Sequence, residues 1–131
     1  DCCKHPSYQD LEGLRVSSHF FIDRSGRLFQ YVSCLDRAWH AGVSSYEGRE
    51  NCNDFSIGVE LEGTDSAPYE QAQYETLGRL TDALAEAYPI KYVTGHSMIA
   101  PLRKTDPGPA FDWLTYESLC KTGKPLCFPY V

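Results

Sequence analysis

The stretch VTGHSMIAPLRKTDPGP, residues 93–109, brings a histidine, a lysine and an aspartate within eleven positions. Residues 92–94 predict a short last strand of a sheet, so His96 follows where the chain leaves the edge of that sheet. Asp106 lies in a turn that the following prolines stiffen, and it therefore loses little conformational entropy when it takes a partner. The stretch thus predicts both a strand and a functional site at its end.

The residue types in this stretch suit a metal site. A neutral imidazole and a carboxylate are ligands for a divalent ion such as zinc, and Lys104, two residues before Asp106, suits the stabilisation of developing negative charge. Two ligands do not make a zinc site. The alternative interpretation is a strand end with a capping histidine and a turn aspartate.

The size and charge of the chain limit the classes of protein to which it can belong. Its 131 residues predict one domain over 1–131, large enough to bury a core without staples, with an unassigned tail over 121–131. The net charge of −6, with Lys and Arg scattered along the chain, argues against nucleic acid as a partner. No apolar run approaches membrane-spanning length, so we expect a soluble monomer without a membrane partner.

The six cysteines leave the redox compartment open. Cys2 and Cys3 are adjacent, and none of the others falls in a C-x-x-C pair. Cys120 and Cys127 could close a short loop in an oxidising compartment. We favour free thiols and, with no leader at the start of the sequence, a cytoplasmic location.

Alternating apolar residues predict two stretches of sheet. Residues 18–32 read as a β-hairpin whose turn contains Gly26 at a positive φ, and residues 56–62 read as a further strand. Glu60 then lies in the middle of that strand, and Gly58 leaves room for something to approach the same face. A solvated outer face is the alternative interpretation of Glu60. The long loop between the two stretches, residues 33–54, is typical of a functional segment.

Three helices are predicted around this sheet. Residues 70–88 carry an apolar stripe that ends at a proline, and this helix should pack on the sheet. Residues 6–14 predict a short helix, and residues 109–119 predict one that begins at a proline and is anchored by Trp113 and Leu114. The fold class is therefore α/β (α+β), with a mixed central sheet flanked by helices.

Four segments make the chain resemble a known family. They are Leu14-Arg15-Val16-Ser17-Ser18-His19, Arg37-Ala38-Trp39-His40-Ala41-Gly42-Val43-Ser44, residues 52–65 (CNDFSIGVELEGTD), and Thr94-Gly95-His96 continuing through residues 103–113 (RKTDPGPAFDW). Through them the chain resembles the N-acetylmuramoyl-L-alanine amidases, and in particular the 1,6-anhydro-muramoyl-alanine amidases of peptidoglycan recycling. The resemblance implies the amidase and peptidoglycan-recognition fold, which agrees with the elements predicted above.

The resemblance also implies roles for individual residues. By position, His96 and Asp106 match two zinc ligands, Glu60 matches the catalytic carboxylate, and Lys104 matches the lysine that supports the transition state. The residues that resemble the border of the muropeptide groove are Arg15, Trp39, His40, Asn53 and Arg103. For His19 and His40, a hydrogen-bonded packing role is the alternative.

The third zinc ligand has no match in this sequence. The family places it as a histidine on an N-terminal strand that would precede Asp1, and His5 matches a helix position instead. The chain also begins without an initiator methionine. We therefore expect it to lack this strand, and residues 1–131 alone to bind little zinc, to aggregate and to show little activity.

The resemblance implies zinc-dependent hydrolysis of the amide between the lactyl group of (1,6-anhydro-)N-acetylmuramic acid and L-alanine, with a muropeptide as substrate. Two alternatives stay open. One is a recognition domain of the same fold that binds peptidoglycan without cutting it. The other is a secreted interaction domain stapled by its cysteines. The sequence leaves open whether the anhydro sugar is required.

Overall fold

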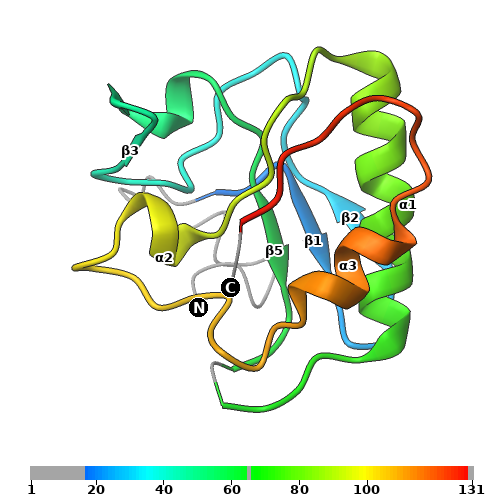
Figure 1. Ribbon diagram of the computed structural model, residues 1–131. Helices are drawn as coiled ribbons and strands as arrows, with labels where there is room; N and C mark the ends of the chain where they lie inside the picture. The colour runs from blue at the N-terminus through cyan, green and yellow to red at the C-terminus, as the bar shows by residue number, and fades with distance from the viewer. Residues whose placement is uncertain (1–16, 65, 130–131) are drawn as a thin grey trace.

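The computed structural model describes residues 17–64 and 66–129, and its centre is a mixed three-stranded sheet of order β2-β1-β5 (Figure 1). The strands of this sheet are β1 (Phe20–Ile22), β2 (Leu28–Gln30) and β5 (Val59–Leu61). β1 pairs antiparallel with β2 and parallel with β5. The predicted fold class, a mixed sheet with helices, is confirmed.

The hairpin of β1 and β2 forms where the alternation of apolar residues predicts it. β1 is fully buried, whereas β2 exposes alternate side chains. Gly26 has φ 87°, and a Cβ at this position would lie 2.8 Å from the carbonyl oxygen of Ala72. Glycine is therefore required in this turn both for the left-handed backbone and for the close approach of the following helix.

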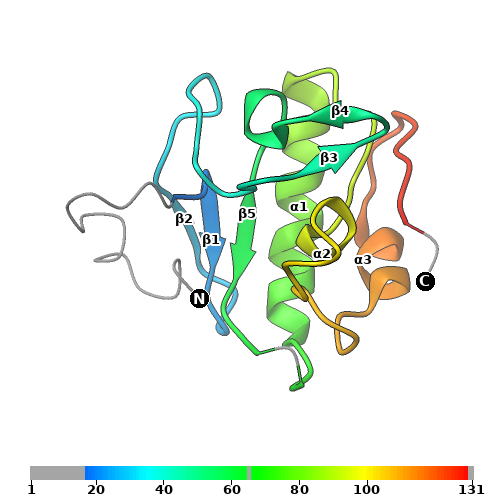
Figure 2. The ribbon, with the colours of Figure 1, turned by 90° about the vertical axis from the view of Figure 1, so that its left-hand side faces the viewer.

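α1 (Gln71–Ala87) covers one face of the sheet, and Figures 1 and 2 both show α2 and β3 on the other side. Gln73 accepts a hydrogen bond from the Glu70 N–H (2.9 Å), which satisfies one of the free donors at the start of the helix. The apolar stripe of α1 enters the core through Tyr74 and Leu77. The predicted helix is confirmed, and it ends before Pro89.

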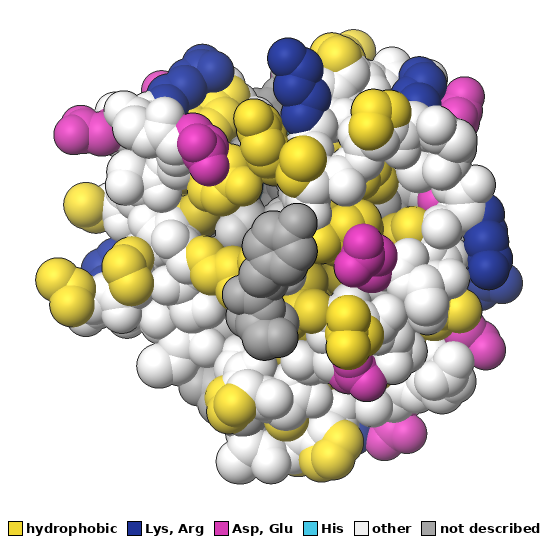
Figure 3. All heavy atoms as spheres, viewed as in Figure 1, with side chains coloured by type: hydrophobic (Ala, Val, Ile, Leu, Met, Phe, Trp, Pro, Cys, Tyr) yellow, Lys and Arg dark blue, Asp and Glu magenta, His cyan; other side chains and the backbone are white. Residues whose placement is uncertain are grey.

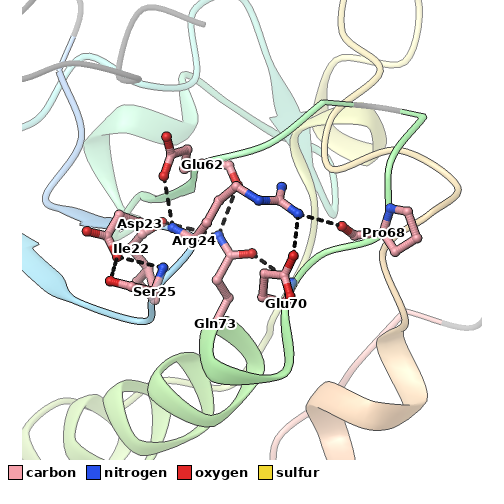
Figure 4. Close-up of polar contacts among 8 residues, drawn as sticks. All are labelled: Ile22, Asp23, Arg24, Ser25, Glu62, Pro68, Glu70 and Gln73. Atoms are coloured by element: carbon pink, nitrogen blue, oxygen red, sulfur yellow. Dashed lines mark hydrogen bonds and ion pairs between the residues drawn. The ribbon is translucent and has the colours of Figure 1, made fainter.

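A group of polar contacts joins the ends of β1 and β5 to the start of α1 (Figure 4). The fully buried Gln73 side chain donates to the carbonyl oxygens of Glu62 (2.9 Å) and Ile22 (3.4 Å). The Arg24 N–H donates to Glu62 Oε1 (2.9 Å), and the Arg24 guanidinium pairs with Glu70 (2.7 Å). These contacts hold Glu62, the residue directly after β5 and two residues after Glu60.

Two of the predicted elements differ from the observed ones. Residues 92–94 form only an isolated bridge, from Tyr92 to Cys127, rather than a strand of the sheet. α3 (Trp113–Leu119) begins four residues after Pro109, because the Asp112 side chain caps it by accepting from the Thr115 N–H. The predicted anchor Leu114 is 76% exposed. Trp113 is buried as predicted, and its buried companion is Tyr116.

The predicted long loop contains short elements of its own. It holds a small hairpin of β3 (Ser45–Tyr46) and β4 (Arg49–Glu50), followed by the 3-10 helix η2 (Cys52–Asp54). The hairpin lies near α2 (His96–Ile99), which follows Gly95. The helix predicted over residues 6–14 lies outside the described residues.

The remaining predictions concern the thiols of the cysteines, the distribution of charge on the surface, and membrane-spanning helices. In the part of the chain that the structure describes, Cys34, Cys52, Cys120 and Cys127 are free. The face in Figure 3 shows Lys and Arg side chains dispersed around its rim, with hydrophobic side chains near its centre. No helix among the described residues is long and apolar enough to cross a membrane.

Candidate active site

The predicted site residues meet in one cavity of about 1340 Å³. Its walls come from the loop before β5, from β5 itself, from α1 and from the segment that carries α2. Eight of the predicted site residues line it: Trp39, His40, Asn53, Glu60, His96, Arg103, Lys104 and Asp106. The ninth, Arg15, lies outside the described residues.

The side chains of His96 and Asp106 contact each other in the wall of this cavity. His96 is the first residue of α2, and its Nδ1 lies 3.2 Å from Asp106 Oδ2. The Ser97 N–H donates to the Asp106 carbonyl oxygen (2.8 Å), which holds the aspartate turn against the start of α2. Gly95 makes this approach possible, because a Cβ there would lie 2.8 Å from Pro107 Cδ.

The second nitrogen of His96 also has an oxygen neighbour. Nε2 lies 3.2 Å from the carbonyl oxygen of Ala41, while Nδ1 lies beside the Asp106 carboxylate. These contacts fix the orientation of the ring within the cavity. An imidazole nitrogen and a carboxylate oxygen are both of the types that can bind a divalent metal ion.

The charge of Asp106 agrees with this arrangement. Burial raises the pKa of the Asp106 carboxyl, but the contact with His96 and the charge of Lys104 outweigh burial, so the pKa lies below its ordinary value. The carboxylate is therefore ionised at neutral pH. Among residues 17–64 and 66–129, no group of three or more His, Cys, Asp or Glu side chains could hold a metal ion.

Glu60 lies at the middle of β5, opposite Phe21 of β1. Its half-buried side chain lines the cavity. The space that Gly58 leaves on this strand is used by the protein itself, because a Cβ at Gly58 would lie 2.5 Å from the His40 ring. The prediction that something approaches this face is therefore explained by His40.

Lys104 reaches the same cavity from the turn after α2. Its backbone N–H donates to the Ala100 carbonyl oxygen (2.9 Å), which closes the turn and places the side chain two residues before Asp106. The ammonium group lowers the pKa of Asp106 through its charge. An ammonium so placed can stabilise negative charge beside a metal.

The two remaining histidines pack beside each other, with ring centroids 5.7 Å apart. His19 is 1% exposed, and both of its nitrogens have partners: Nδ1 accepts from the Gly58 N–H (3.1 Å), and Nε2 contacts the Asp36 carbonyl oxygen (2.8 Å). His19 is therefore the packing residue that the alternative interpretation describes. Burial, and then the neighbouring His19 and His96, lower the pKa of His40 to about 4.

Three residues predicted to border the substrate groove also have partners within the chain. The Asn53 side chain accepts from the backbone N–H groups of His40 (3.0 Å) and Ala41 (2.8 Å). The Arg103 guanidinium donates to the Ala41 carbonyl oxygen (2.6 Å). The Trp39 ring is 38% exposed, and the Arg37 guanidinium lies 4.3 Å from its centroid. Contact of these residues with substrate stays a prediction.

Sequence reasoning did not identify Ala41 as part of the site. It is fully buried, and its carbonyl oxygen accepts a hydrogen bond from the Arg103 guanidinium and contacts Nε2 of His96. Since the contacts are made by the backbone, the side chain at position 41 carries no signal of them. The only available hint was the neighbouring Trp39, His40 and Gly42 in a segment rich in site residues.

Comparison with known proteins places this arrangement in context. The model of the N-acetylmuramoyl-L-alanine amidase family matches residues 1–109. The 1,6-anhydro-N-acetylmuramyl-L-alanine amidase AmpD of Escherichia coli K12 is 57% identical over 117 residues, which cover 88% of this chain and 64% of AmpD. The N-acetylmuramoyl-L-alanine amidase AmiD of the same organism is 38% identical over 125 residues, covering 82% of this chain and 45% of AmiD.

Solved structures give the same result. A selenomethionine derivative of AmpD matches with a TM-score of 0.78 at 54% identity, covering 91% of this chain and 68% of that one. E. coli AmiD, solved with the substrate anhydro-N-acetylmuramic acid-L-Ala-D-γ-Glu-L-Lys, matches with a TM-score of 0.77 at 37% identity, covering 86% of this chain and 51% of that one. This chain thus spans about two thirds or less of the proteins it matches. With sequence and fold in agreement over most of its length, it belongs to the N-acetylmuramoyl-L-alanine amidase family.

Proposed function

We propose that this domain is the catalytic part of a zinc-dependent amidase that hydrolyses the bond between the lactyl group of (1,6-anhydro-)N-acetylmuramic acid and L-alanine. The observation that carries the proposal is the opposition of His96 Nδ1 and Asp106 Oδ2, 3.2 Å apart, in the cavity that Glu60 and Lys104 also line. A domain that only binds peptidoglycan has no need for these four side chains together.

The donor set fits zinc. A neutral imidazole nitrogen and an ionised carboxylate are ordinary zinc ligands, and here Nδ1 of His96 and Oδ2 of Asp106 lie 3.2 Å apart. Bound zinc would lower the pKa of a water molecule and polarise the amide carbonyl. Zinc in catalytic sites takes three protein ligands. We therefore assign His96 and Asp106 as two of them and expect the third from outside the described residues.

The residues of this chain would then carry the proton and the charge. Glu60 accepts the proton of the attacking water and passes it to the nitrogen of the leaving L-alanine. Lys104 stabilises the negative charge that develops on the amide oxygen. Trp39, His40 and Asn53 line the same cavity and would border the muropeptide.

We further propose that the third ligand is a histidine on a strand that pairs with β5. Among the described residues, β1 is the strand that pairs with β5, and no described strand pairs with the other edge of β5. The cavity extends along this edge between β5, residues 91–94 and α1, where Leu77 and Leu84 line it. A strand in this space would bury apolar surface and bring its side chains close to His96.

The test of this strand compares two forms of the protein. One is the 131-residue chain, and the other is the same chain preceded by a histidine-bearing strand of the kind that the family has. Bound zinc is measured by atomic absorption, and we expect less than one equivalent in the first form and one in the second. Equal, tight binding of one zinc by both forms would show that the third ligand lies within residues 1–131.

The test of the reaction is release of stem peptide from an anhydro-muropeptide, measured on the form that binds zinc fully. Glu60→Gln should keep the zinc and lose about 10²- to 10⁴-fold in turnover, the usual contribution of a general base. Glu62→Gln is the matched control, since its side chain accepts from the Arg24 N–H at the far end of β5. Undiminished release by Glu60→Gln would remove Glu60 from this role. Binding of the muropeptide without release by the unmodified protein would favour a recognition domain instead.

We also propose that the reaction belongs to cell-wall recycling in the cytoplasm. The free thiols of the four described cysteines and the identity to AmpD support this location. Fractionation of the source cells is the measurement. Amidase activity confined to the periplasm would contradict it.

A further inference from the structure

The hairpin of β3 and β4 contributes part of the cavity wall and lies beside α2 (Figure 2). Two aromatic rings join it to the chain that leads to His96. Tyr46 of β3 packs edge-on against Tyr92, with ring centroids 5.3 Å apart and ring planes at 62°, and both tyrosines line the cavity. The hairpin is therefore held against the segment that carries the proposed zinc ligands.

Arg49 of β4 is directly opposite Tyr46 in the hairpin, and residues paired in this way project to the same side of the two strands. The guanidinium carbon of Arg49 lies 4.0 Å from the centroid of the Phe55 ring, and both side chains line the cavity. The attraction between a cation and an aromatic face restricts the orientation of the long arginine side chain. Phe55 is fixed in turn at the end of η2, where its N–H donates to the Cys52 carbonyl oxygen (3.2 Å).

A second arginine lines this cavity, and the protein uses it differently. The Arg103 guanidinium donates to the carbonyl oxygens of Ala41 (2.6 Å) and Val43 (3.0 Å). Among the described residues, the partner of the Arg49 guanidinium is the Phe55 ring, which attracts its charge and leaves N–H groups for an acceptor. The planar fork of these donors matches the two oxygens of a carboxylate. Arg49 is therefore suited to bind a carboxylate that comes from outside the chain.

An acidic side chain in the same part of the wall opposes this binding only weakly. Glu47 lies two residues before Arg49, in the turn between the two strands, and it also lines the cavity. It is exposed, so water and salt screen its charge. A guanidinium that pairs with a carboxylate acts instead through short hydrogen bonds, which depend on direct contact.

The charges of the proposed substrate indicate which half of it would meet Arg49. The amine of N-acetylmuramic acid is acetylated, and its lactyl carboxyl is part of the amide that is cut, so the sugar half carries no charge. In the substrate solved with AmiD, the γ-linked glutamate has a free α-carboxylate and the lysine has a terminal carboxylate. A cation in the cavity wall therefore suits the peptide half.

We propose that Arg49, held by the Phe55 ring, binds a carboxylate of the stem peptide and thereby places the peptide half of the substrate along the hairpin of β3 and β4. This inference rests on the proposed function for the identity of the ligand. Arg49 binds substrate here without taking part in the reaction, so its loss should change KM rather than kcat. A charge-assisted hydrogen bond at an exposed site should contribute about tenfold in affinity.

The first experiment measures peptide binding without any reaction. Isothermal titration calorimetry gives the Kd for the tripeptide L-Ala-D-γ-Glu-L-Lys. Arg49→Met keeps an unbranched side chain over Phe55 but removes the donors, and it should raise this Kd about tenfold. Arg49→Lys keeps the charge without the planar fork and should raise the Kd by less. The matched control is Arg79→Met, at an exposed arginine of α1 that does not line the cavity, and its Kd should be unchanged.

Two derivatives of the tripeptide identify the carboxylate that Arg49 binds. In one the α-carboxylate of glutamate is a carboxamide, and in the other the terminal carboxylate is. Amidation of the bound carboxylate should weaken binding to the unmodified protein about tenfold and cost Arg49→Met nothing further, because donor and acceptor form one pair. Additive losses with both derivatives overturn the inference. An unchanged Kd in Arg49→Met overturns it too, and so does an unmodified protein that does not bind the tripeptide.

The second experiment separates this inference from the proposed function. In release of stem peptide from an anhydro-muropeptide, Arg49→Met should raise KM about tenfold at unchanged kcat. If the unmodified protein releases no stem peptide while Arg49 and one carboxylate are coupled in binding, the proposed reaction fails and the carboxylate site stands. Release with the same KM in Arg49→Met and the unmodified protein overturns the inference and leaves the proposed reaction in place.

Discussion

Asp23, in the turn between β1 and β2, and Asp106, in the turn after α2, are aspartates whose pKa values both lie below the ordinary range, but for different reasons. Oxygen Oδ1 of Asp23 accepts from the Ser25 N–H and hydroxyl and from the Arg27 N–H, and Oδ2 pairs with the Arg27 guanidinium. Asp106 Oδ2 instead lies 3.2 Å from Nδ1 of His96, and the contact with His96 and the charge of Lys104 lower the pKa of Asp106 against the effect of burial.

Asp23 stabilises a turn, whereas we propose that Asp106 binds a ligand, and their hydrogen-bond partners differ accordingly. The donors around Asp23, led by Ser25, lower its pKa to about 2 and leave its oxygens satisfied by the protein. The described side-chain partner of Asp106 Oδ2 is instead the His96 ring, which is itself of a type that can bind a metal ion. A turn aspartate whose oxygens are all hydrogen-bonded stabilises the fold, whereas we propose that one beside an imidazole in a cavity binds a cation.

The largest expected effect comes from removing each carboxylate in turn and measuring the affinity of the protein for Zn²⁺. Asp106→Ala should raise the dissociation constant for Zn²⁺ by more than the 10- to 100-fold typical of an outer partner, because it removes a ligand itself. Asp23→Ala should leave zinc affinity within a few-fold. Titration of both variants with Zn²⁺ decides the matter, and unchanged affinity in Asp106→Ala would remove this residue from the ligand set.

The next effect concerns Lys104, which lies between the two ligands in sequence. Lys104→Ala should lower kcat about a hundredfold at unchanged zinc content, because loss of one electrostatic donor costs about 2 to 4 kcal/mol of transition-state stabilisation. The matched control is Lys91→Ala, since Lys91 is a second lysine that lines the same cavity. A normal kcat for Lys104→Ala, measured by release of stem peptide, would refute the electrostatic role.

The sequence predicts the hairpin and α1 because their signals are local. Gly26 and the alternating apolar residues define the turn and its strands, and an uninterrupted stripe with Pro89 after it defines the helix. The sequence also predicted four residues for catalysis and metal binding, and they line one cavity: Glu60, His96, Lys104 and Asp106.

The remaining features depend on contacts that are distant in sequence. Residues 92–94 have the apolar pattern of a strand, but among the described residues they form one isolated bridge, from Tyr92 to Cys127, rather than a strand of the sheet. Leu114 is apolar and was predicted to anchor the helix. In the structure α3 is capped by Asp112, and Leu114 lies on its exposed face. The role of the Ala41 carbonyl could not be predicted at all, because backbone atoms are the same at every position.

A smaller effect tests the structural side of the comparison. Asp23→Ala should lower the free energy of unfolding by about 2 to 3 kcal/mol, since it removes several hydrogen bonds to one charged group and leaves the donors of Ser25 and Arg27 unpaired. Urea denaturation of metal-free protein measures this value. Asp106→Ala, which removes a side chain that is 42% exposed and its contact with His96, should change it by less than about 1 kcal/mol. Equal losses in the two variants would erase the distinction between the two turns.

The smallest effect is a pH dependence of the free energy of unfolding that arises from His40, which lines the cavity. Burial, followed by the nearby His19 and His96, lowers the pKa of His40 from 6.5 to about 4, so the folded protein keeps this ring neutral where the unfolded chain would protonate it. Between these two values the unfolded state binds more protons, and the free energy of unfolding therefore falls as the pH falls. The His40 contribution is present in full above about pH 6.5 and is lost as the pH approaches 4. At 1.36 kcal/mol per pKa unit, and reduced for the partial exposure of the ring, the loss is about 2 kcal/mol.

Urea denaturation of metal-free protein at a series of pH values, for the unmodified protein and His40→Gln, isolates this contribution as the difference between the two curves. That difference should be flat above pH 6.5 and change by about 2 kcal/mol below it, and parallel curves throughout would show that His40 titrates alike in the folded and unfolded states.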